Sequence, residues 1–181
     1  MPERFYLISL IMKYLFFVAS LFFVFNTATV FGQASYEKDG LTWYTDIMKA
    51  QEQSRASNKP IFAFFTGSDW CGWCHKLERE VFEKAAFKKW AKEKVILVEL
   101  DFPRNKQLPT ELAQQNASLQ QTFQVQGYPT IWLFFLDKDK TSNKMNISAL
   151  GSLGYPRGAE QGKEEVKFLQ DANEVLAKKQ G

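Results

Sequence analysis

Cysteine and histidine are scarce in this chain of 181 residues, which contains two cysteines and one histidine. Two cysteines cannot build a scaffold held by several disulfides, and with one histidine they cannot complete a four-ligand zinc site. Proline and glycine are also few, at 6 and 10 residues, whereas 45% of the chain is apolar. This composition excludes collagen-like and wholly disordered chains, so we expect a globular protein without a bound metal.

The sequence also lacks a strong excess of charge of one sign. Its 23 basic and 20 acidic residues leave a net charge of +3, and no run of Lys and Arg is dense enough to form a nucleic-acid surface. We therefore expect no nucleic-acid partner. The length suits one domain with a sizeable core, or at most two small ones.

The beginning of the chain has the layout of a secretory signal peptide. Lys13 precedes an apolar run at residues 14–25, and small residues follow at Gly32 and Ala34. A cation, an apolar run of about a dozen residues and a small-residue site are typical of such leaders. We predict cleavage between Ala34 and Ser35.

Cleavage there divides the chain into a signal peptide at 1–34 and a folded domain at 35–181. An uncleaved membrane anchor is the alternative, and only then would the protein contact a membrane. The uninterrupted apolar run is shorter than the ~20 residues that span a bilayer, which favours cleavage. In both cases the domain is exported, to the periplasm or as a secreted protein, where disulfides persist.

Strand and helix patterns alternate through the predicted domain. Unbroken apolar runs of strand length suit strands buried on both faces, and apolar residues at helical spacing separate them. Residues 35–45 are interpreted as a lead-in, and Met48, Ala86 and Val166 are expected to face inward. The expected strands are 61–65, 95–100, 130–136 and 145–150, and the expected helical segments lie near 47–56, 81–90, 110–123 and 166–176. This order predicts an α/β fold with a mixed sheet and helices on both faces.

Both cysteines and the histidine fall within residues 71–75, between a predicted strand and a predicted helix. A separation of three residues on a first helical turn places Cys71 and Cys74 on one face, within reach of each other, so a disulfide can form and break. The N–H groups and partial positive charge of a helix N-terminus favour the thiolate of the first cysteine. We predict that Cys71 is the exposed nucleophile and Cys74 the resolving thiol.

The neighbours of the pair suit contact with another chain. Gly72 leaves room for close approach, and Trp70 and Trp73 offer apolar surface to a partner protein. A purely structural disulfide is the alternative, but a loop this short constrains the unfolded chain little. We therefore favour redox chemistry.

Two motifs together resemble the thioredoxin superfamily: GSDWCGWC at residues 67–74 and GYPT at residues 127–130. The first is similar to that of exported bacterial thioredoxin-like proteins, and the resemblance covers about residues 41–179. It implies a thioredoxin fold and a thiol–disulfide oxidoreductase of the protein-disulfide reductase kind. Such a protein acts on disulfide-containing or dithiol proteins, depends on an upstream thiol redox partner and needs no cofactor.

The resemblance also implies that Pro129 is a cis proline beside the cysteine pair. The backbone of Tyr128 would then be free to pair with a substrate strand, so Tyr128 and Pro129 are predicted substrate-binding residues. An ordinary trans turn proline is the alternative.

Two features depart from the family pattern. Many thioredoxins carry a buried acidic residue in the strand before the cysteines, but residues 62–65 contain no carboxylate. Proton transfer would then use water or another residue, such as Glu78 or Glu99. His75 follows the second cysteine where Lys is usual, and it either tunes the thiols near neutral pH or faces solvent.

Two other functions fit parts of the sequence. Residues 71–75 match the C-x-x-C-H pattern of c-type haem attachment, with His75 as an axial ligand. That function would explain neither the buried strands nor the GYPT motif. A non-redox peptide-binding or chaperone module on the same fold is the other alternative, and it would function without Cys71.

Overall fold

The structure is a computed structural model that describes residues 33–138 and 145–178. Contacts divide the chain into residues 1–30 and 31–181, and the fold below belongs to the second unit. The predicted signal peptide lies outside the described residues apart from Gln33 and Ala34, so its cleavage stays a prediction. Part of the loop expected after residue 136 also lies outside them.

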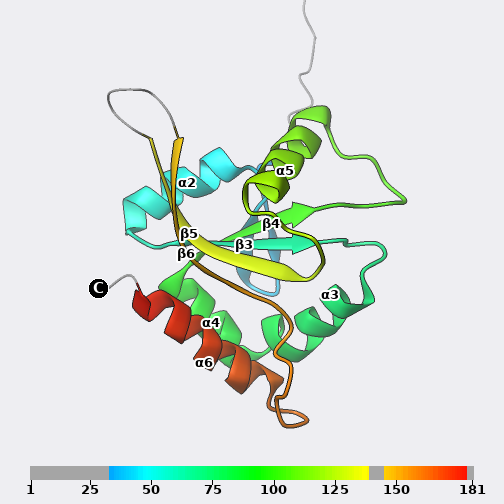
Figure 1. Cartoon of the computed structure of the whole chain (residues 1–181), viewed down its shortest axis with the longest axis vertical. Coiled ribbons are helices and arrows are strands. Elements are labelled where there is room, and N and C mark those ends of the chain that lie inside the picture. Colours follow the sequence, from blue (N-terminus) through cyan, green and yellow to red (C-terminus); the bar gives the residue numbers. More distant parts are fainter. Residues whose placement is uncertain (1–32, 139–144, 179–181) are drawn as a thin grey trace, which may run out of the picture. The chain divides into compact units, whose positions relative to one another are not determined.

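Within the described residues, six strands form one mixed sheet (Figure 1). The sequence predicts the mixed sheet and four of these strands, but not the two at residues 35–38 and 41–44. The strands are β1 Ser35–Lys38, β2 Leu41–Tyr44, β3 Ile61–Thr66, β4 Ile96–Asp101, β5 Thr130–Lys138 and β6 Met145–Leu153. Their order across the sheet is β1-β2-β4-β3-β5-β6. The pairs β2–β4 and β3–β4 are parallel, whereas β1–β2, β3–β5 and β5–β6 are antiparallel.

Helices cover both faces of this sheet, which confirms the expected fold class. They are α2 Ile47–Ser57, α3 Gly72–Leu77, the π-helical turn η1 Glu78–Phe82, α4 Ala85–Lys94, α5 Thr110–Thr122 and α6 Glu164–Ala177. The first apolar cluster packs α3, η1, α4 and α6 on one face, and the second packs α2 and α5 on the other (Figure 1). Within residues 33–138 and 145–178, no helix has the length and apolar character needed to cross a bilayer.

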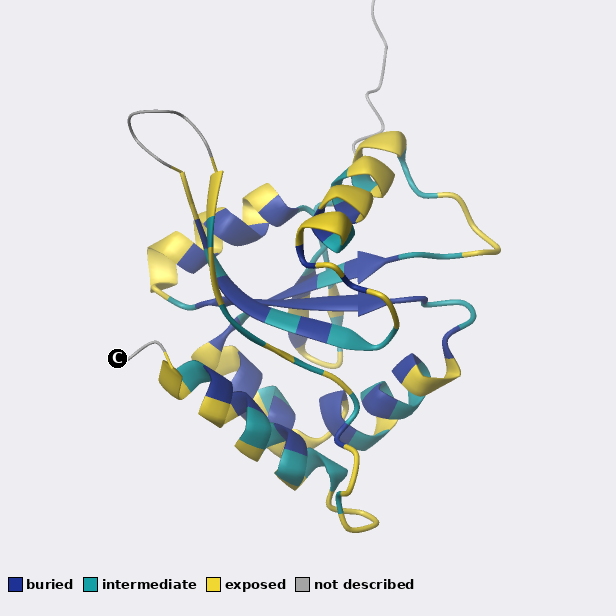
Figure 2. Cartoon of the chain, in the orientation of Figure 1, coloured by how far each residue is buried: buried dark blue, intermediate teal, exposed yellow. Residues whose placement is uncertain are grey.

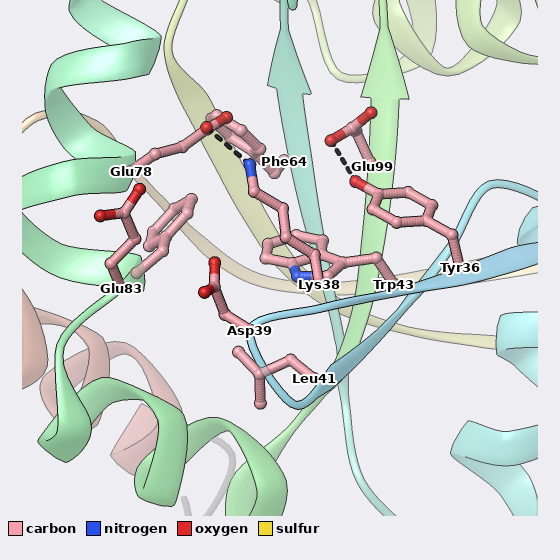
Figure 3. Close-up of a pocket in the computed structure, with 10 residues that line it drawn as sticks. Tyr36, Lys38, Asp39, Leu41, Trp43, Phe64, Glu78, Glu83 and Glu99 are labelled. Atoms are coloured by element: carbon pink, nitrogen blue, oxygen red, sulfur yellow. Dashed lines mark hydrogen bonds and ion pairs between the residues drawn. The ribbon is translucent and has the colours of Figure 1, made fainter.

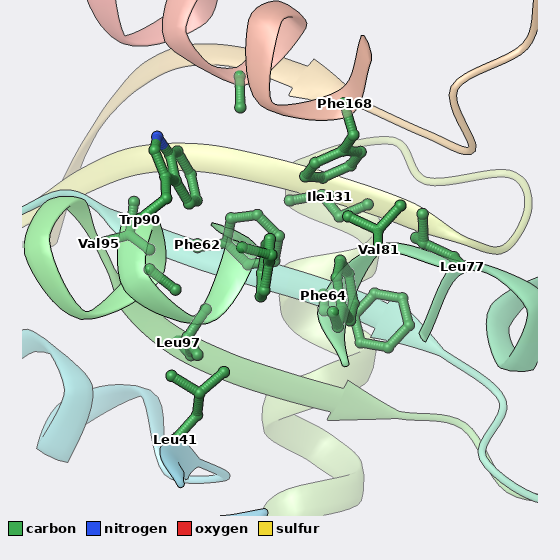
Figure 4. Packing of buried hydrophobic residues seen from close by; sticks show 14 of the residues in the cluster. Leu41, Phe62, Phe64, Leu77, Val81, Trp90, Val95, Leu97, Ile131 and Phe168 are labelled. Atoms are coloured by element: carbon green, nitrogen blue, oxygen red, sulfur yellow. The ribbon is translucent and has the colours of Figure 1, made fainter. Parts of the chain in front are cut away.

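Strand β3 runs through the middle of the sheet and is buried along its whole length (Figure 2). Phe62 and Phe64 face the first cluster, while Phe65 faces the second. Figure 4 shows Phe62 surrounded by side chains from the helices on its face, and its ring centroid lies 6.2 Å from those of Trp90 and Phe168. Aromatic contacts of this kind add to the hydrophobic free energy of burial. These contacts hold β3 firmly against the helices on this face.

Local sequence signals set the ends of α2 as expected. The Asp46 carboxylate accepts hydrogen bonds from the backbone N–H groups of Met48 and Lys49, at 2.8 and 3.3 Å. Asn58 ends the helix in the left-handed conformation, with a φ of 53°. Both are common capping devices.

Four sequence expectations are wrong. The presumed lead-in at residues 35–45 contains the antiparallel hairpin β1–β2, whose two-residue turn is Asp39-Gly40, with φ values of 57° and 75°. Asp-Gly is a favoured sequence for such a turn, and it was the signal that the sequence interpretation missed. The side chains of Met48, Ala86 and Val166 are exposed rather than inward-facing. Phe87 takes the inward position expected of Ala86, because α4 begins a new helix after η1.

We predict that Phe62→Ala lowers the free energy of unfolding by ~3–5 kcal/mol, because it empties space in the centre of the first cluster. Urea unfolding of the oxidised protein measures this change. The control is Val166→Ala, which alters a side chain that is 62% exposed and should change stability by no more than ~0.5 kcal/mol. Equal effects of the two substitutions would contradict the central role of β3.

Candidate active site

The cysteine pair lies at the start of α3, just after the loop that follows β3. Cys71 is the N-cap of α3, and its Sγ accepts a hydrogen bond of 3.2 Å from the backbone N–H of Cys74. The two sulfurs are joined in a disulfide, with the Cα atoms 5.2 Å apart. The prediction that residues 71 and 74 can reach each other from one helical turn is therefore confirmed.

Cys71 is less exposed than the sequence predicts. Only 5% of its surface is accessible, against none for Cys74. Both cysteines belong to the first apolar cluster, and the partly buried rings of Trp70 and Tyr128 pack against that cluster. Packing into this cluster is the reason that Cys71 is less exposed than expected. Of the two cysteines, only Cys71 presents surface to an incoming group.

Hydrogen bonds join the loop between β3 and α3 to the end of β4 and the residue that follows it. Ser68 donates two hydrogen bonds to the buried Asp101 carboxylate, from its backbone N–H at 2.8 Å and its Oγ at 2.6 Å. Lys106 Nζ lies 2.9 Å from the same carboxylate. The Trp70 indole donates to the Phe102 carbonyl at 2.8 Å. These bonds fix the residues that lead into the cysteine pair.

The Tyr128–Pro129 peptide bond is cis, as the resemblance implies. Phe65 pairs with Thr130, so the cis bond lies beside the end of β3 that leads to the cysteines. The Tyr128 ring packs between Trp70 and Phe102, with centroids 5.8 and 5.2 Å away, and its hydroxyl accepts a 2.8 Å hydrogen bond from Gln120. This packing holds the Tyr128 ring within the protein.

The outer rim of the pair carries an exposed aromatic platform. Trp73 is 57% exposed, and its ring lies 5.1 Å from that of Tyr155 in an edge-to-face arrangement. Lys76 Nζ lies over both rings, at 5.2 and 5.0 Å from their centroids. A Cβ atom added to Gly72 would have no atom within 4 Å. The surface beside the pair is therefore aromatic, with a lysine over its rings, and it is uncrowded at Gly72.

His75 points back to the loop before the cysteines. Its Nε2 lies 2.8 Å from the Ser68 carbonyl oxygen, an acceptor, so Nε2 donates. Of the two alternatives for His75, a side chain that faces solvent is not the one observed, because the ring is part-buried and bound to the loop. A role of His75 in tuning the thiols stays a prediction. The bond links α3 to the loop that Asp101 holds.

The two carboxylates suggested for proton transfer lie on different elements, η1 and β4. Glu78 follows Cys74 by one helical turn, with its N–H bonded to the Cys74 carbonyl. Glu99 on β4 pairs with Phe64, which belongs to the same cluster as both cysteines. Both carboxylates line one pocket, into which Phe64 also faces (Figure 3).

Two residues from the hairpin bind these carboxylates. The Tyr36 hydroxyl donates a 2.5 Å hydrogen bond to Glu99, and Lys38 Nζ lies 2.8 Å from Glu78 (Figure 3). Burial is the main reason that the pKa of Glu99 is raised, and the bond from Tyr36 opposes that rise. The sequence interpretation missed Tyr36 and Lys38, because it left residues 35–45 without structure.

The fold, the cis proline and the cysteine pair define a thioredoxin-like protein. Residues 47–141, more than half of the chain, match the Thioredoxin-like domain family, and the chain belongs to that family.

Two curated relatives come from Chlamydia pneumoniae. Disulfide bond reductase DsbH is 37% identical over 108 residues, which are 59% of this chain and 64% of the relative. Thioredoxin-related protein DsbJ is 26% identical over 151 residues, which are 83% of this chain and 42% of the relative. The match therefore spans less than two thirds of either relative.

Solved structures show the same fold. A DsbH oxidoreductase superposes with a TM-score of 0.61 at 28% identity, over 84% of this chain and 93% of that one. A thioredoxin from Thermus thermophilus superposes with a TM-score of 0.51 at 15% identity, over 76% and 88% of the two chains.

We predict that Asp101→Ala loosens the loop before the cysteines and lowers the free energy of unfolding by ~2–3 kcal/mol. It would leave the Ser68 donors and Lys106 without their acceptor. The control is Asp171→Ala, which breaks the pair of Asp171 with Lys167 on the surface of α6 and should cost less than ~1 kcal/mol. Urea unfolding compares the two, and a smaller loss for Asp101→Ala than for Asp171→Ala would refute the anchoring role.

Proposed function

We propose that this protein is an exported thiol–disulfide oxidoreductase that exchanges disulfides with partner proteins through Cys71 and Cys74. One observation carries the proposal: a bridged cysteine pair at the first turn of α3 lies beside the cis Pro129. The family match and the relatives named for disulfide chemistry support it. The predicted signal peptide at 1–34 supports export.

Reduction of a client begins at Cys71. In the dithiol form its sulfur is held as a thiolate by the Cys74 N–H and by the partial positive charge of the helix start. The thiolate attacks a client disulfide, so a bond forms between Cys71 and one client sulfur while the client disulfide breaks. The other client sulfur leaves as a thiolate and takes a proton from water.

Cys74 completes the exchange. It loses its proton and attacks Cys71 Sγ, which forms the Cys71–Cys74 disulfide and releases the client's second sulfur. Two electrons pass from the protein dithiol to the client disulfide, and an upstream dithiol protein restores the reduced pair by the same steps in reverse. No bound cofactor is needed, since both electrons reside in sulfur.

The rim residues hold the client. Trp70, Trp73 and the open space at Gly72 supply apolar contact around Cys71. The Tyr128 backbone, next to Pro129, pairs with an extended client segment, while the Tyr128 ring stays packed against Phe102. His75 fixes the loop through its bond to Ser68.

Glu99 is the proton acceptor for Cys74 in this proposal, and it takes the place of the carboxylate that residues 62–65 lack. It lies beside Phe64 on the same sheet face as the pair. Burial raises its pKa from the ordinary value, which brings a carboxylate closer to the pH at which proton exchange with a thiol is efficient. Glu78 faces the same pocket from the helix.

The haem alternative fits the site poorly. Attachment through Cys71 and Cys74 would need both sulfurs free at the surface, yet Cys74 has no exposed surface. The ring of His75 is bound to Ser68 instead of facing an open site.

We predict that Cys71→Ser lowers insulin reduction by more than ~10²-fold, because it removes the attacking sulfur. Cys74→Ser should instead accumulate a mixed disulfide with the client, since Cys71 can attack but nothing resolves the product. Turbidity measures the first and non-reducing electrophoresis the second. Full activity of Cys71→Ser would overturn the mechanism and favour the non-redox chaperone module.

We further predict that the rate of the resolving step falls as pH drops through the pKa of Glu99, because only the ionised carboxylate accepts a proton. Since that pKa is raised, the fall begins at a higher pH than for an exposed carboxylate. Glu99→Gln should abolish this dependence and slow the step by ~10²-fold at neutral pH. Release of glutathione from a Cys71 mixed disulfide measures the rate, with the exposed Glu93→Gln as control. If Glu99→Gln had the same pH–rate profile as Glu93→Gln, Glu99 would not be the proton acceptor for Cys74.

A further inference from the structure

The β1–β2 hairpin contributes a tyrosine and a lysine to the two carboxylates behind the cysteine pair. Tyr36 and Lys38 alternate with Glu37 along β1, so both point to the same side of the strand. The Tyr36 hydroxyl reaches Glu99 at 2.5 Å and the Lys38 ammonium reaches Glu78 at 2.8 Å (Figure 3). The Tyr36 ring packs against the first apolar cluster, which also contains both cysteines.

The two carboxylates come from two elements on the face of the sheet that carries the cysteine pair. Glu78 lies four residues after Cys74 on one helical face. Glu99 lies on the sheet under that face, in register with Phe64. The hairpin therefore binds two carboxylates that line one pocket with Phe64, a residue of the cluster that contains both cysteines.

We propose that Tyr36 is a positioning residue for the resolving step, holding the Glu99 carboxylate in place and in its ionised form while Cys74 transfers its proton. Lys38 contributes to the same step by holding the Glu78 carboxylate in an ion pair. The inference rests on the proposed function and assigns a role within it to strand β1. The hydroxyl stays a donor throughout, because burial and the adjacent Glu99 raise the pKa of Tyr36 well above its ordinary value.

The groups around Glu99 determine whether its pKa rises or falls when Tyr36 is changed. Burial raises the pKa of Glu99 most, and the carboxylates of Asp101 and Glu78 raise it further, while the hydrogen bond from Tyr36 and the charge of Lys38 lower it. The titratable groups that face this pocket or act on Glu99 are Tyr36 and Lys38 from β1, Asp39 from the turn, Glu78 and Glu83 from η1 and its end, and Asp101 from β4. Loss of the Tyr36 hydroxyl removes a donor to the ionised carboxylate, so the pKa must rise.

The proton and the electrons of the resolving step are all accounted for when Glu99 is the proton acceptor. The Cys74 thiol gives its proton to the Glu99 carboxylate, and the resulting thiolate attacks Cys71 Sγ. The Cys71–Cys74 bond forms as the bond from Cys71 to the client breaks, and the client sulfur leaves with the electron pair. In the reverse direction, protonated Glu99 returns the proton to Cys74 as the disulfide opens.

The test compares Tyr36→Phe with Tyr44→Phe, a matched control. Tyr44 lies on β2 of the same hairpin but packs against the second cluster, on the other face of the sheet. The resolving step is followed as glutathione release from a Cys71 mixed disulfide across pH 4–9, which is roughly the range where carboxylates and thiols titrate. The Glu99 carboxyl is titrated separately by carbon NMR in the oxidised protein, with Glu99→Gln to assign the signal.

We expect Tyr36→Phe to move the acid limb of the rate profile to higher pH and to move the NMR titration of Glu99 in the same direction. At pH 6 the rate should fall by ~3- to 10-fold, less than the full contribution of a general base. Tyr44→Phe should leave both curves unchanged. Lys38→Met should shift them in the same direction by less, because Lys38 acts at longer range.

An unchanged Glu99 titration in Tyr36→Phe would overturn this inference while leaving the proposed function intact. Lower stability with an unmoved rate profile would also overturn it, since Tyr36 would then be structural only. If Tyr36→Phe does not fold, Lys38→Met carries the same test. Full disulfide exchange by Cys71→Ser would instead overturn the proposed function, independently of where Glu99 titrates.

Discussion

Burial of β3 on both faces is the constraint on which the other features depend. All six of its residues are buried, with Phe62 and Phe64 packed on one side and Phe65 on the other. A strand held this way cannot shift its register without moving apolar groups into water or into the wrong cluster. The end of β3 therefore fixes where the following loop begins, and that loop leads to Cys71 at the start of α3.

The same apolar packing shapes the chemistry of the pair. Phe64 faces the first cluster from β3, and its partner on the neighbouring β4 is Glu99, a carboxylate. A carboxylate at this depth loses hydration, which raises its pKa, and it needs a hydrogen-bond donor to remain in place. The donor comes from Tyr36, the second residue of the first strand. The apolar central strand β3 and the polar hairpin at the edge of the sheet thus meet at Glu99, which pairs with Phe64 and accepts a hydrogen bond from Tyr36.

Polar contacts tie the loop around the cysteines to three separate elements. Asp101 at the end of β4 binds Ser68, the Phe102 carbonyl binds Trp70, and His75 of α3 binds the Ser68 carbonyl. Each contact joins residues distant in sequence or separated by a turn. Together they fix the loop that leads into the pair, in which Cys71 keeps 5% of its surface accessible and Cys74 none.

The sequence by itself determined the elements and the reactive pair. Largely apolar runs identified β3, β4 and β5, because a strand covered on both faces exposes few positions to water. The spacing of Cys71 and Cys74 on one helical turn identified the disulfide. It also contained the Asp39-Gly40 turn, although two four-residue strands are too short for alternation to show clearly. Only the tertiary structure decided that Cys71 is nearly covered, that His75 turns back to Ser68, and that Tyr36 meets Glu99 across 63 positions of sequence. Those contacts depend on which elements pack together, and a local pattern carries no information about a partner so far along the chain.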